Sequence, residues 1–285
     1  MVNLPKSVQS LFFSPTGSTK KITEAVSDGL GIPLALSIDI TSKKKREAWS
    51  GKLDGDLLVV GVPVYHSTFP AVILPTLKKL NGEGRFAVPI AVCGHAKFGA
   101  CLPQVAGILK KQGFKIVAAG NFIGQHTYAT DESPLGRGRP DVNDLKIATD
   151  FGRKVITKLR TSSSEVVNIH YGPRGASAYV QIYQEGNLAA QGAMLAESYY
   201  PFIKVLVSSD PKGRCVGCQR CAESCPTGAI DANSLRINEA TCTRCWACVI
   251  SCPQGLLQKY ISPSSPHLEW FREQAFHRGV PQTYL

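Results

Sequence analysis

The sequence predicts an α/β domain with a doubly wound, parallel, five-stranded sheet, followed by a small α+β domain. Five short apolar runs alternate with helical patterns over the first 160 residues, which is typical of a parallel sheet covered on both faces. Two identical rows of four cysteines follow, 27 residues apart. The cysteine-rich unit is too small to fill a chain of 285 residues. We therefore expect domains at residues 1–160 and 210–260, an insertion or linker at 161–209, and a tail at 261–285.

The expected strands are short apolar runs bounded by turn residues, and the expected helices carry apolar side chains with helical spacing. Asp141 is placed to cap the last helix of the first domain, and Gly113 to end the helix before it. The strands are expected at 7–13, 34–40, 57–62, 86–93 and about 115–123, and the helices after residue 19, at 71–80, at 102–112 and after residue 141. Further strand patterns occur at 178–183 and 204–208.

A turn rich in hydroxyl groups directly follows the first expected strand. A strand, a turn and a helix N-terminus together collect free backbone N–H groups and a positive dipole end, which bind anions such as phosphate. Simple helix capping is the alternative, but a cap needs one hydroxyl group rather than four. The turn lacks the Walker spacing, and no Gly-x-Gly-x-x-Gly follows a strand, so NAD binding has no support. The candidate phosphate-binding residues are Ser14, Thr16, Gly17, Ser18 and Thr19.

The loops after the third and fourth expected strands contain aromatic and small residues. In a doubly wound sheet, ligands bind outside the carboxyl ends of the strands, so these two loops converge on the hydroxyl-rich turn. Tyr65, Phe69 and Phe98 are expected to flank a planar ring, and His95 or Lys97 to lie near negative charge. The candidate ring contacts are Pro63, Val64, Tyr65, His66, Ser67, Thr68, Phe69, Gly94, His95, Lys97, Phe98 and Gly99.

Each cysteine row has the spacing Cys-x2-Cys-x2-Cys-x3-Cys-Pro, which is the bacterial two-cluster ferredoxin spacing. In this arrangement the fourth cysteine of a row binds the other cluster. Structural zinc fits poorly because each row has a third and a fourth cysteine, and disulfides are less expected in a chain without a signal peptide. We expect Trp246, inside the second row, to pack beside a cluster rather than to conduct electrons. One [4Fe-4S] cluster is assigned to Cys215, Cys218, Cys221 and Cys252, and the other to Cys242, Cys245, Cys248 and Cys225.

The first 160 residues resemble a flavodoxin, because residues 14–19 match its phosphate loop of the form Ser/Thr-x-Thr-Gly-x-Thr. The whole chain is similar to the fused flavodoxin–ferredoxin family of anaerobic microbes, in which the stretches at 122–128 and 138–141 are also familiar. The resemblance implies a flavodoxin-like fold and FMN, with its phosphate on the hydroxyl-rich turn and its isoalloxazine ring at the loops around Tyr65 and Phe98. Flavodoxins are commonly acidic around the ring, whereas these loops carry His66, His95 and Lys97. Such cations favour the anionic reduced flavin.

The chain is basic, with a formal net charge of +11. Two clusters and a flavin phosphate would reduce this charge to roughly +5, which still favours an acidic partner such as a small ferredoxin or flavodoxin. The run from Lys43 to Arg46 is interpreted as a solvated helix start, and no nucleic-acid motif is present. No stretch has the roughly 20 apolar residues that span a bilayer, so a cytoplasmic location is expected. Cys93 and Cys101 are expected to be buried thiols.

These features favour an electron-transfer flavoprotein that relays single electrons between a redox partner, two [4Fe-4S] clusters and FMN. The main alternative is a reductase, fed by the clusters, that acts on a small quinone-like compound or corrinoid. A roomy cavity lined by His66, His95 and His126 would favour this reductase, and a buried flavin near a cluster would favour the relay. A cluster-based redox sensor is a third alternative. The protein partner could also be a downstream reductase, and a long distance between cluster and flavin would require a homodimer.

Overall fold

The computed structural model describes residues 4–94, 98–161, 167, 169, 202–208, 214–274 and 279–285. Two expected ring contacts, His95 and Lys97, lie outside the described residues, as does the expected strand at 178–183.

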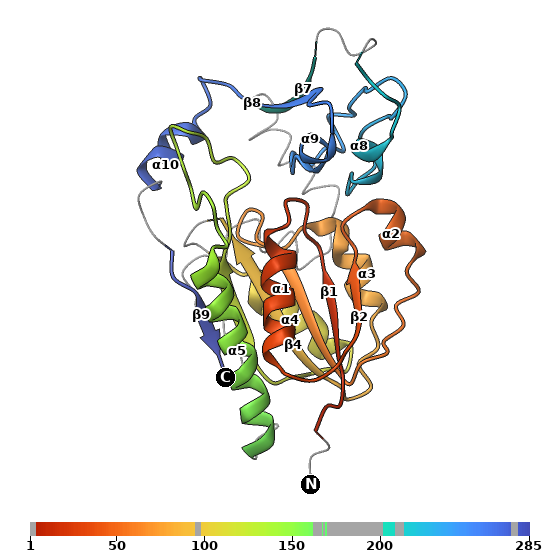
Figure 1. The fold of residues 1–285 in the computed structure, drawn as a ribbon, viewed down its shortest axis with the longest axis vertical. Coiled ribbons are helices and arrows are strands. Elements are labelled where there is room, and N and C mark those ends of the chain that lie inside the picture. The colour runs from red at the N-terminus through yellow and green to blue at the C-terminus, as the bar shows by residue number, and fades with distance from the viewer. Residues whose placement is uncertain are drawn as a thin grey trace.

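The N-terminal part is built on a parallel sheet with the order β2-β1-β3-β4-β6, which is the flavodoxin-like order (Figure 1). The predicted fold class is therefore confirmed. One expected strand, at 115–123, is interrupted: β5 and β6 each pair with β4, and two residues lie between them. The strands are β1 (Val8–Phe12), β2 (Leu34–Asp39), β3 (Leu57–Pro63), β4 (Phe86–Cys93), β5 (Lys115–Ile116) and β6 (Ala119–Ile123).

Helices cover both faces of this sheet and bury two separate apolar layers. The apolar side of α1 and α5 packs with Val59, Val88 and Ile90 on one face, while α3 and α4 pack on the other. Asp141 caps α5 as predicted, because its side chain accepts hydrogen bonds from the backbone N–H groups of Asn143 and Asp144. The helices are α1 (Ser18–Gly29), α2 (Lys43–Ala48), α3 (Leu74–Lys79) after a 3-10 turn at Ala71–Ile73, α4 (Cys101–Lys111) and α5 (Val142–Thr161).

The basic run at the start of α2 forms a helix, but it is not solvated throughout. Lys43, Lys44 and Lys45 are exposed, whereas only 8% of Arg46 is exposed. The prediction of a solvated run is therefore wrong for Arg46. Its guanidinium group contacts the second domain instead, as described below.

The small C-terminal domain lies over the carboxyl ends of the sheet strands (Figure 1). It contains an antiparallel pair, β7 (Ile203–Val207) and β8 (Leu257–Ile261), and two short helices, α8 (Arg220–Glu223) and α9 (Ala247–Ser251). The strand expected at 204–208 is thus present, and its pairing with β8 extends the domain to the N-terminal side of residue 210.

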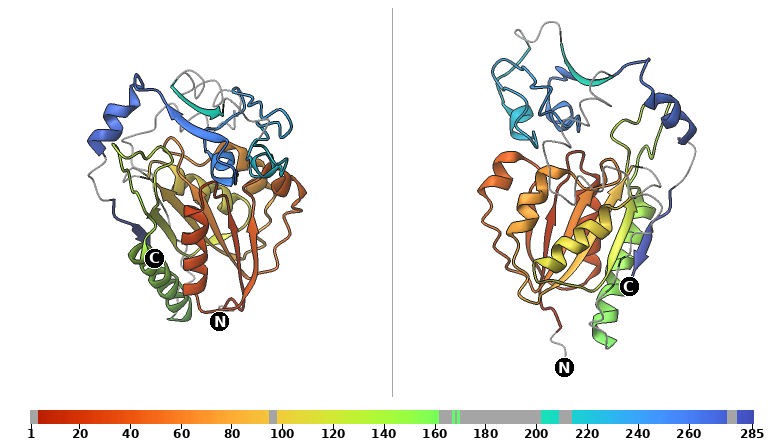
Figure 2. Two further views of the ribbon diagram at one scale, coloured as in Figure 1. Left: turned by 45° about the horizontal axis from the view of Figure 1, so that its top comes forward. Right: turned by 180° about the vertical axis from the view of Figure 1, so that it is seen from behind.

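The C-terminal tail returns from the small domain to the sheet (Figure 2). It forms α10 (His267–Gln274) and β9 (Gln282–Tyr284), and β9 pairs antiparallel with the edge strand β6. No sequence pattern predicted this strand. In the part of the chain that the structure describes, no helix is long and apolar enough to span a membrane.

Candidate cofactor sites

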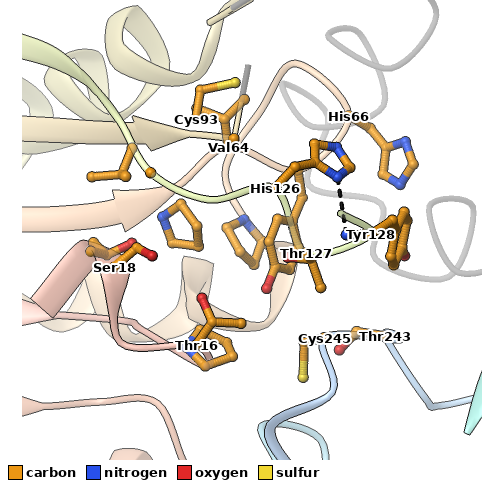
Figure 3. Close-up of a pocket in the computed structure, with 18 of the residues that line it drawn as sticks. Thr16, Ser18, Val64, His66, Cys93, His126, Thr127, Tyr128, Thr243 and Cys245 are labelled. Atoms are coloured by element: carbon orange, nitrogen blue, oxygen red, sulfur yellow. Dashed lines mark hydrogen bonds between the residues drawn. The ribbon is translucent and has the colours of Figure 1, made fainter. Parts of the chain in front are cut away.

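A cavity of about 430 Å³ lies at the carboxyl ends of the sheet strands, between the two domains (Figure 3). Its walls come from the hydroxyl-rich turn, from the segments after β3, β4 and β6, and from the small domain and the tail. The lining residues include Thr16, Ser18, Thr19, Pro63, Val64, Tyr65, His66, Ser67, Cys93, Gly94, Gly124, Gln125, His126, Thr127, Tyr128, Thr243, Arg244, Cys245, Trp270 and Phe271.

Some side chains of the hydroxyl-rich turn stabilise the start of α1, and others line the cavity. The Ser14 Oγ accepts a hydrogen bond from the Lys20 backbone N–H at 3.0 Å, so this residue holds the start of α1. Gly17 has a φ of 89°, a left-handed conformation that favours glycine. Thr16, Ser18 and Thr19 line the cavity, beside the helix N-terminus whose first N–H groups have no intrahelical acceptor. This combination of hydroxyl groups and backbone N–H groups fits a phosphate group.

Half of the expected ring contacts reach the cavity. Pro63, Val64, Tyr65, His66, Ser67 and Gly94 line it. Thr68 does not, because it is buried and donates a hydrogen bond to the Gln104 Oε1 at 2.5 Å, and Gly99 packs against Ser67.

The two phenylalanines expected at the ring lie in the core instead. Phe69 is 1% exposed within the apolar layer under α3 and α4, and Phe98 is 6% exposed and packs with Cys93 and Ile123. Burying these large rings in the core removes more apolar surface from water than lining an open cavity would. This placement differs from the expectation that they flank a planar ring.

The segment after β6 forms another wall of the cavity. The resemblance of residues 122–128 to the fused family was its one sequence signal. A methyl group at Gly124 would lie 2.9 Å from the Ser18 Cβ, so only glycine permits this close approach to the turn. The His126 Nδ1 accepts a hydrogen bond from the Tyr128 backbone N–H at 3.0 Å. The aromatic rings of His126, Tyr128 and Phe271 contact one another, so this wall continues into the tail.

The eight row cysteines form two groups that exchange their fourth members. Burial raises the pKa of the Cys221 thiol, and the nearby charges of Cys252 and Cys218 raise it further. Burial likewise raises the pKa of Cys248, with added effects from the charges of Cys245, Cys242 and Cys225. A small second cavity is lined by Cys215, Cys218, Cys221 and Cys252. Cys252 thus lies near the first row and Cys225 near the second. This arrangement is compatible with the exchanged ligand sets, which stay a prediction.

The surroundings of these thiols fit iron–sulfur ligation. The Ala229 backbone N–H donates a hydrogen bond to the Cys225 Sγ at 3.2 Å, an interaction that stabilises a thiolate ligand. Among the described residues, no group of three or more His, Cys, Asp or Glu side chains could hold a metal ion. The four ligands of a [4Fe-4S] cluster surround several iron and sulfide ions and so lie further apart than the ligands of one ion.

Cys245 belongs to both sites. It is a member of the second cysteine group, and it also lines the large cavity, where it lies across from Cys93 (Figure 3). The adjacent Trp246 is 1% exposed. The centroid of its ring lies 5.0 Å from the centroid of the Tyr128 ring, and the Lys259 Nζ lies 4.6 Å from the centroid of the Trp246 ring. Trp246 is therefore packed between the two domains, while its place beside a cluster stays a prediction.

Comparisons with known proteins match the two parts of the chain separately. A family model described as a 4Fe-4S binding domain matches residues 212–231 and 235–258. A search of curated protein sequences found no match. Among solved structures, a flavodoxin from the domain Archaea matches with 14% identity and a TM-score of 0.40, over 54% of this chain and 99% of that chain. A WrbA-like flavodoxin from Agrobacterium tumefaciens matches with 17% identity and a TM-score of 0.36, over 54% of this chain and 98% of that chain.

The fold assignment of the N-terminal part rests on its strand order. The chain therefore joins an α/β domain with a flavodoxin-like strand order to a C-terminal part that matches a 4Fe-4S binding domain.

Proposed function

We propose that this protein relays single electrons between a redox partner, two [4Fe-4S] clusters and FMN. The observation that carries this proposal is the double position of Cys245, which belongs to the second cysteine group and lines the cavity next to the hydroxyl-rich turn. A cluster held by Cys245 would therefore adjoin a flavin bound in that cavity.

The flavin site is assigned to the cavity between the domains. Thr16, Ser18, Thr19 and the N-terminus of α1 would hold the phosphate. The segment from Pro63 to Ser67, with Gly94 and the wall from Gly124 to Tyr128, would surround the ring. When bound, FMN supplies the exchange between one-electron and two-electron chemistry.

The other cysteine group is the proposed contact with the redox partner. Two cysteines of the first group, Cys215 and Cys218, are exposed, whereas every cysteine of the second group is buried or half-buried. Two large apolar side chains near the exposed group also face solvent, since Val216 is 64% exposed and Ile250 is 56% exposed. Exposed Arg214 and Arg220 flank it and suit an acidic partner.

A pair of cysteine variants tests the relay and the ligand assignment together. Loaded wild-type protein should contain about eight irons and one FMN, and Cys225→Ser or Cys252→Ser should each leave about four irons. Cys252→Ser should remove the exposed cluster and keep the cluster beside the cavity. It should therefore slow reduction by a protein donor but preserve exchange between the remaining cluster and FMN, whereas Cys225→Ser should abolish that exchange.

Anaerobic reductive titration, followed through the separate flavin and cluster absorbance, measures these effects. Loss of all iron in both variants would leave the exchanged assignment unsupported. Exchange with FMN that survives in Cys225→Ser and fails in Cys252→Ser would contradict it.

A reductase is the second candidate, because His66 and His126 line the same cavity and could donate protons to a small acceptor. The reductase would be supported if a quinone-like compound, added after the same titration, rapidly reoxidised the reduced protein without any protein partner.

A further inference from the structure

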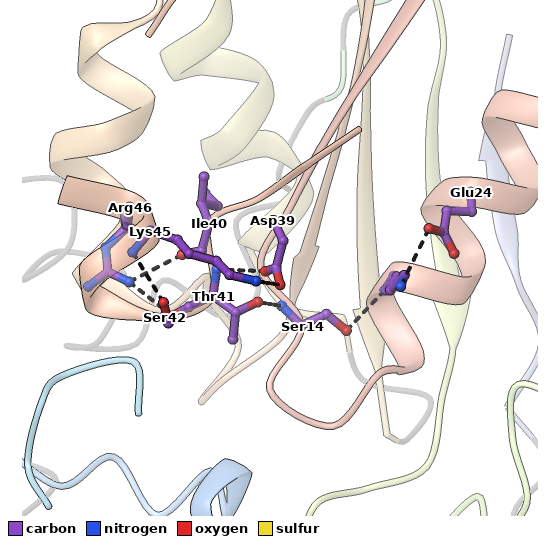
Figure 4. Close-up of polar contacts among 9 residues, drawn as sticks. Ser14, Glu24, Asp39, Ile40, Thr41, Ser42, Lys45 and Arg46 are labelled. Carbon is purple, nitrogen blue, oxygen red and sulfur yellow. Dashed lines mark hydrogen bonds and ion pairs between the residues drawn. The ribbon is translucent and has the colours of Figure 1, made fainter. Parts of the chain in front are cut away.

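Arg46 is the buried member of an otherwise exposed basic run on α2. Its Nη1 donates hydrogen bonds to the carbonyl oxygens of Ile40 at 3.2 Å and Thr41 at 3.0 Å, at the carboxyl end of β2 (Figure 4). Its Nη2 donates to the carbonyl oxygen of Pro226 at 2.6 Å, in the small domain. One guanidinium group therefore connects the sheet to the turn that follows Cys225.

A second hydrogen bond reinforces this connection. The Lys43 backbone N–H, at the start of α2, donates to the carbonyl oxygen of Cys225 at 3.2 Å. Two consecutive carbonyl groups of the small domain, from Cys225 and Pro226, are thus held by one helix of the first domain. Cys225 is the proposed fourth ligand of the cluster beside the cavity.

The same contacts extend to the hydroxyl-rich turn. Thr41, whose carbonyl oxygen accepts from Arg46, also uses its Oγ1 to accept a hydrogen bond from the Ser14 backbone N–H at 2.8 Å (Figure 4). The Ser14 Oγ in turn accepts from the Lys20 N–H. A continuous set of hydrogen bonds therefore links the proposed phosphate site to the Cys225–Pro226 turn.

No carboxylate oxygen forms a hydrogen bond or an ion pair with the Arg46 guanidinium group in the part of the chain that the structure describes. The neighbouring Glu47 pairs with Lys43, and the partners of the guanidinium group are three neutral carbonyl oxygens. Burial lowers the pKa of Arg46, and the neighbouring Glu47 and Cys225 partly offset that shift. A buried cation without an anion is costly. An oxidised [4Fe-4S] cluster with four thiolates carries a charge of about −2 and would supply that anion.

We propose that Arg46 is a positioning residue that locks the Cys225 end of the second cluster site to the phosphate turn and raises the reduction potential of that cluster with its charge. The proposal rests on the proposed function. Reduction makes the cluster more negative, so a nearby cation stabilises the reduced form. The planar guanidinium group of Arg46 also fixes the distance between the two cofactor sites, because it donates hydrogen bonds to carbonyl groups of both domains.

The test uses loaded full-length protein with three substitutions. Arg46→Met removes both the charge and the fork, and Arg46→Lys keeps the charge but cannot bridge the same carbonyl groups. Lys44→Met is the matched control, because it removes one charge from an exposed position of the same helix. Hydrogen exchange of peptides covering Lys43 and Ala229 reports the lock, and potentiometric titration followed by electron paramagnetic resonance reports the cluster potentials.

We expect Arg46→Met to shift one of the two cluster potentials to a more negative value. It should also speed exchange of the Lys43 amide roughly 10- to 150-fold, which corresponds to the loss of a charged hydrogen bond. Arg46→Lys should speed exchange but keep the potential near the wild-type value. Lys44→Met should change neither. If Arg46→Met does not assemble its clusters, Arg46→Lys still tests the lock through exchange.

The proposal would be overturned if Arg46→Met and Lys44→Met showed the same amide hydrogen exchange and the same cluster potentials. The proposed effect of the Arg46 charge on the cluster potential would be overturned if that potential fell as far in Arg46→Lys as in Arg46→Met. Failure of the proposed function is a separate result. It would appear in the wild-type protein as absent FMN, or as clusters that do not exchange electrons with FMN, whereas the lock is judged from the exchange of the Lys43 amide.

Discussion

Ser14 and Ser18 are four positions apart in one turn, yet their hydroxyl groups have different surroundings. The Ser18 side chain lines the cavity, whereas the Ser14 Oγ accepts from the Lys20 N–H. We expect Ser18→Ala to weaken FMN binding roughly 10- to 150-fold, because a hydrogen bond to a charged group contributes about 1.5–3 kcal/mol. Ser14→Ala should instead lower the free energy of unfolding by about 1 kcal/mol, as the loss of a helix cap does. Fluorescence titration with FMN and urea unfolding measure the two effects.

Each of these two serines serves as the control for the other. An FMN affinity that falls equally in both variants would mean that the Ser14 hydroxyl also contacts the phosphate. An unchanged FMN affinity in Ser18→Ala would mean that the phosphate does not bind at the N-terminus of α1.

At the residue scale, a site can be predicted from the sequence where its signal is local. The spacing within each cysteine row is a short-range property, and so is the hydroxyl-rich turn between a strand and a helix. Phe69 and Phe98 were misplaced because an aromatic residue after a strand can equally line a cavity or fill the core. The burial of Arg46 was not predicted, because the Pro226 carbonyl group that accepts its hydrogen bond is 180 residues away in the sequence.

At the element scale, the C-terminal tail closes one side of the cavity. Trp270 and Phe271 of α10 line it, and the Phe271 ring centroid lies 5.1 Å from that of His126. The tail is fixed at its far end, where β9 pairs with β6 between Tyr284 and Ala119. No sequence pattern predicted this strand, since three residues after a proline carry too little periodicity, and the partner strand is distant along the chain.

Ending the chain after residue 280 removes β9 and leaves α10 in place. We expect the free energy of unfolding to fall by about 1–3 kcal/mol, since each lost ladder hydrogen bond contributes about 1 kcal/mol. The freed tail should also expose the cavity, so iodide should quench the fluorescence of bound FMN more strongly. Removing only Leu285, which is 49% exposed, is the control and should leave quenching unchanged. Equal quenching in both truncated proteins would mean that β9 does not hold the wall in place.

At the scale of the whole molecule, the arrangement of the two domains determines whether one chain suffices for the relay. Strand order and cysteine spacing were predictable, but the position of the small domain over the cavity was not, because it depends on contacts between distant segments. Those contacts include the Arg46 hydrogen bonds to both domains and the packing of Tyr128 on Trp246. They bring Cys245 to the wall of the cavity within a single chain.

We therefore expect electron exchange between the second cluster and FMN to be a first-order process whose rate constant does not change over an about hundredfold dilution, because both cofactor sites belong to one folded unit. Stopped-flow reduction at several protein concentrations measures this rate constant. A mixture of Cys225→Ser protein loaded with FMN and wild-type protein without FMN provides the control, since it separates the two cofactors on different chains. Slow, concentration-dependent exchange in the mixture and fast, concentration-independent exchange in the intact protein would support transfer within one chain. A rate in the intact protein that falls on dilution would instead require a second chain to bring its cluster to the cavity.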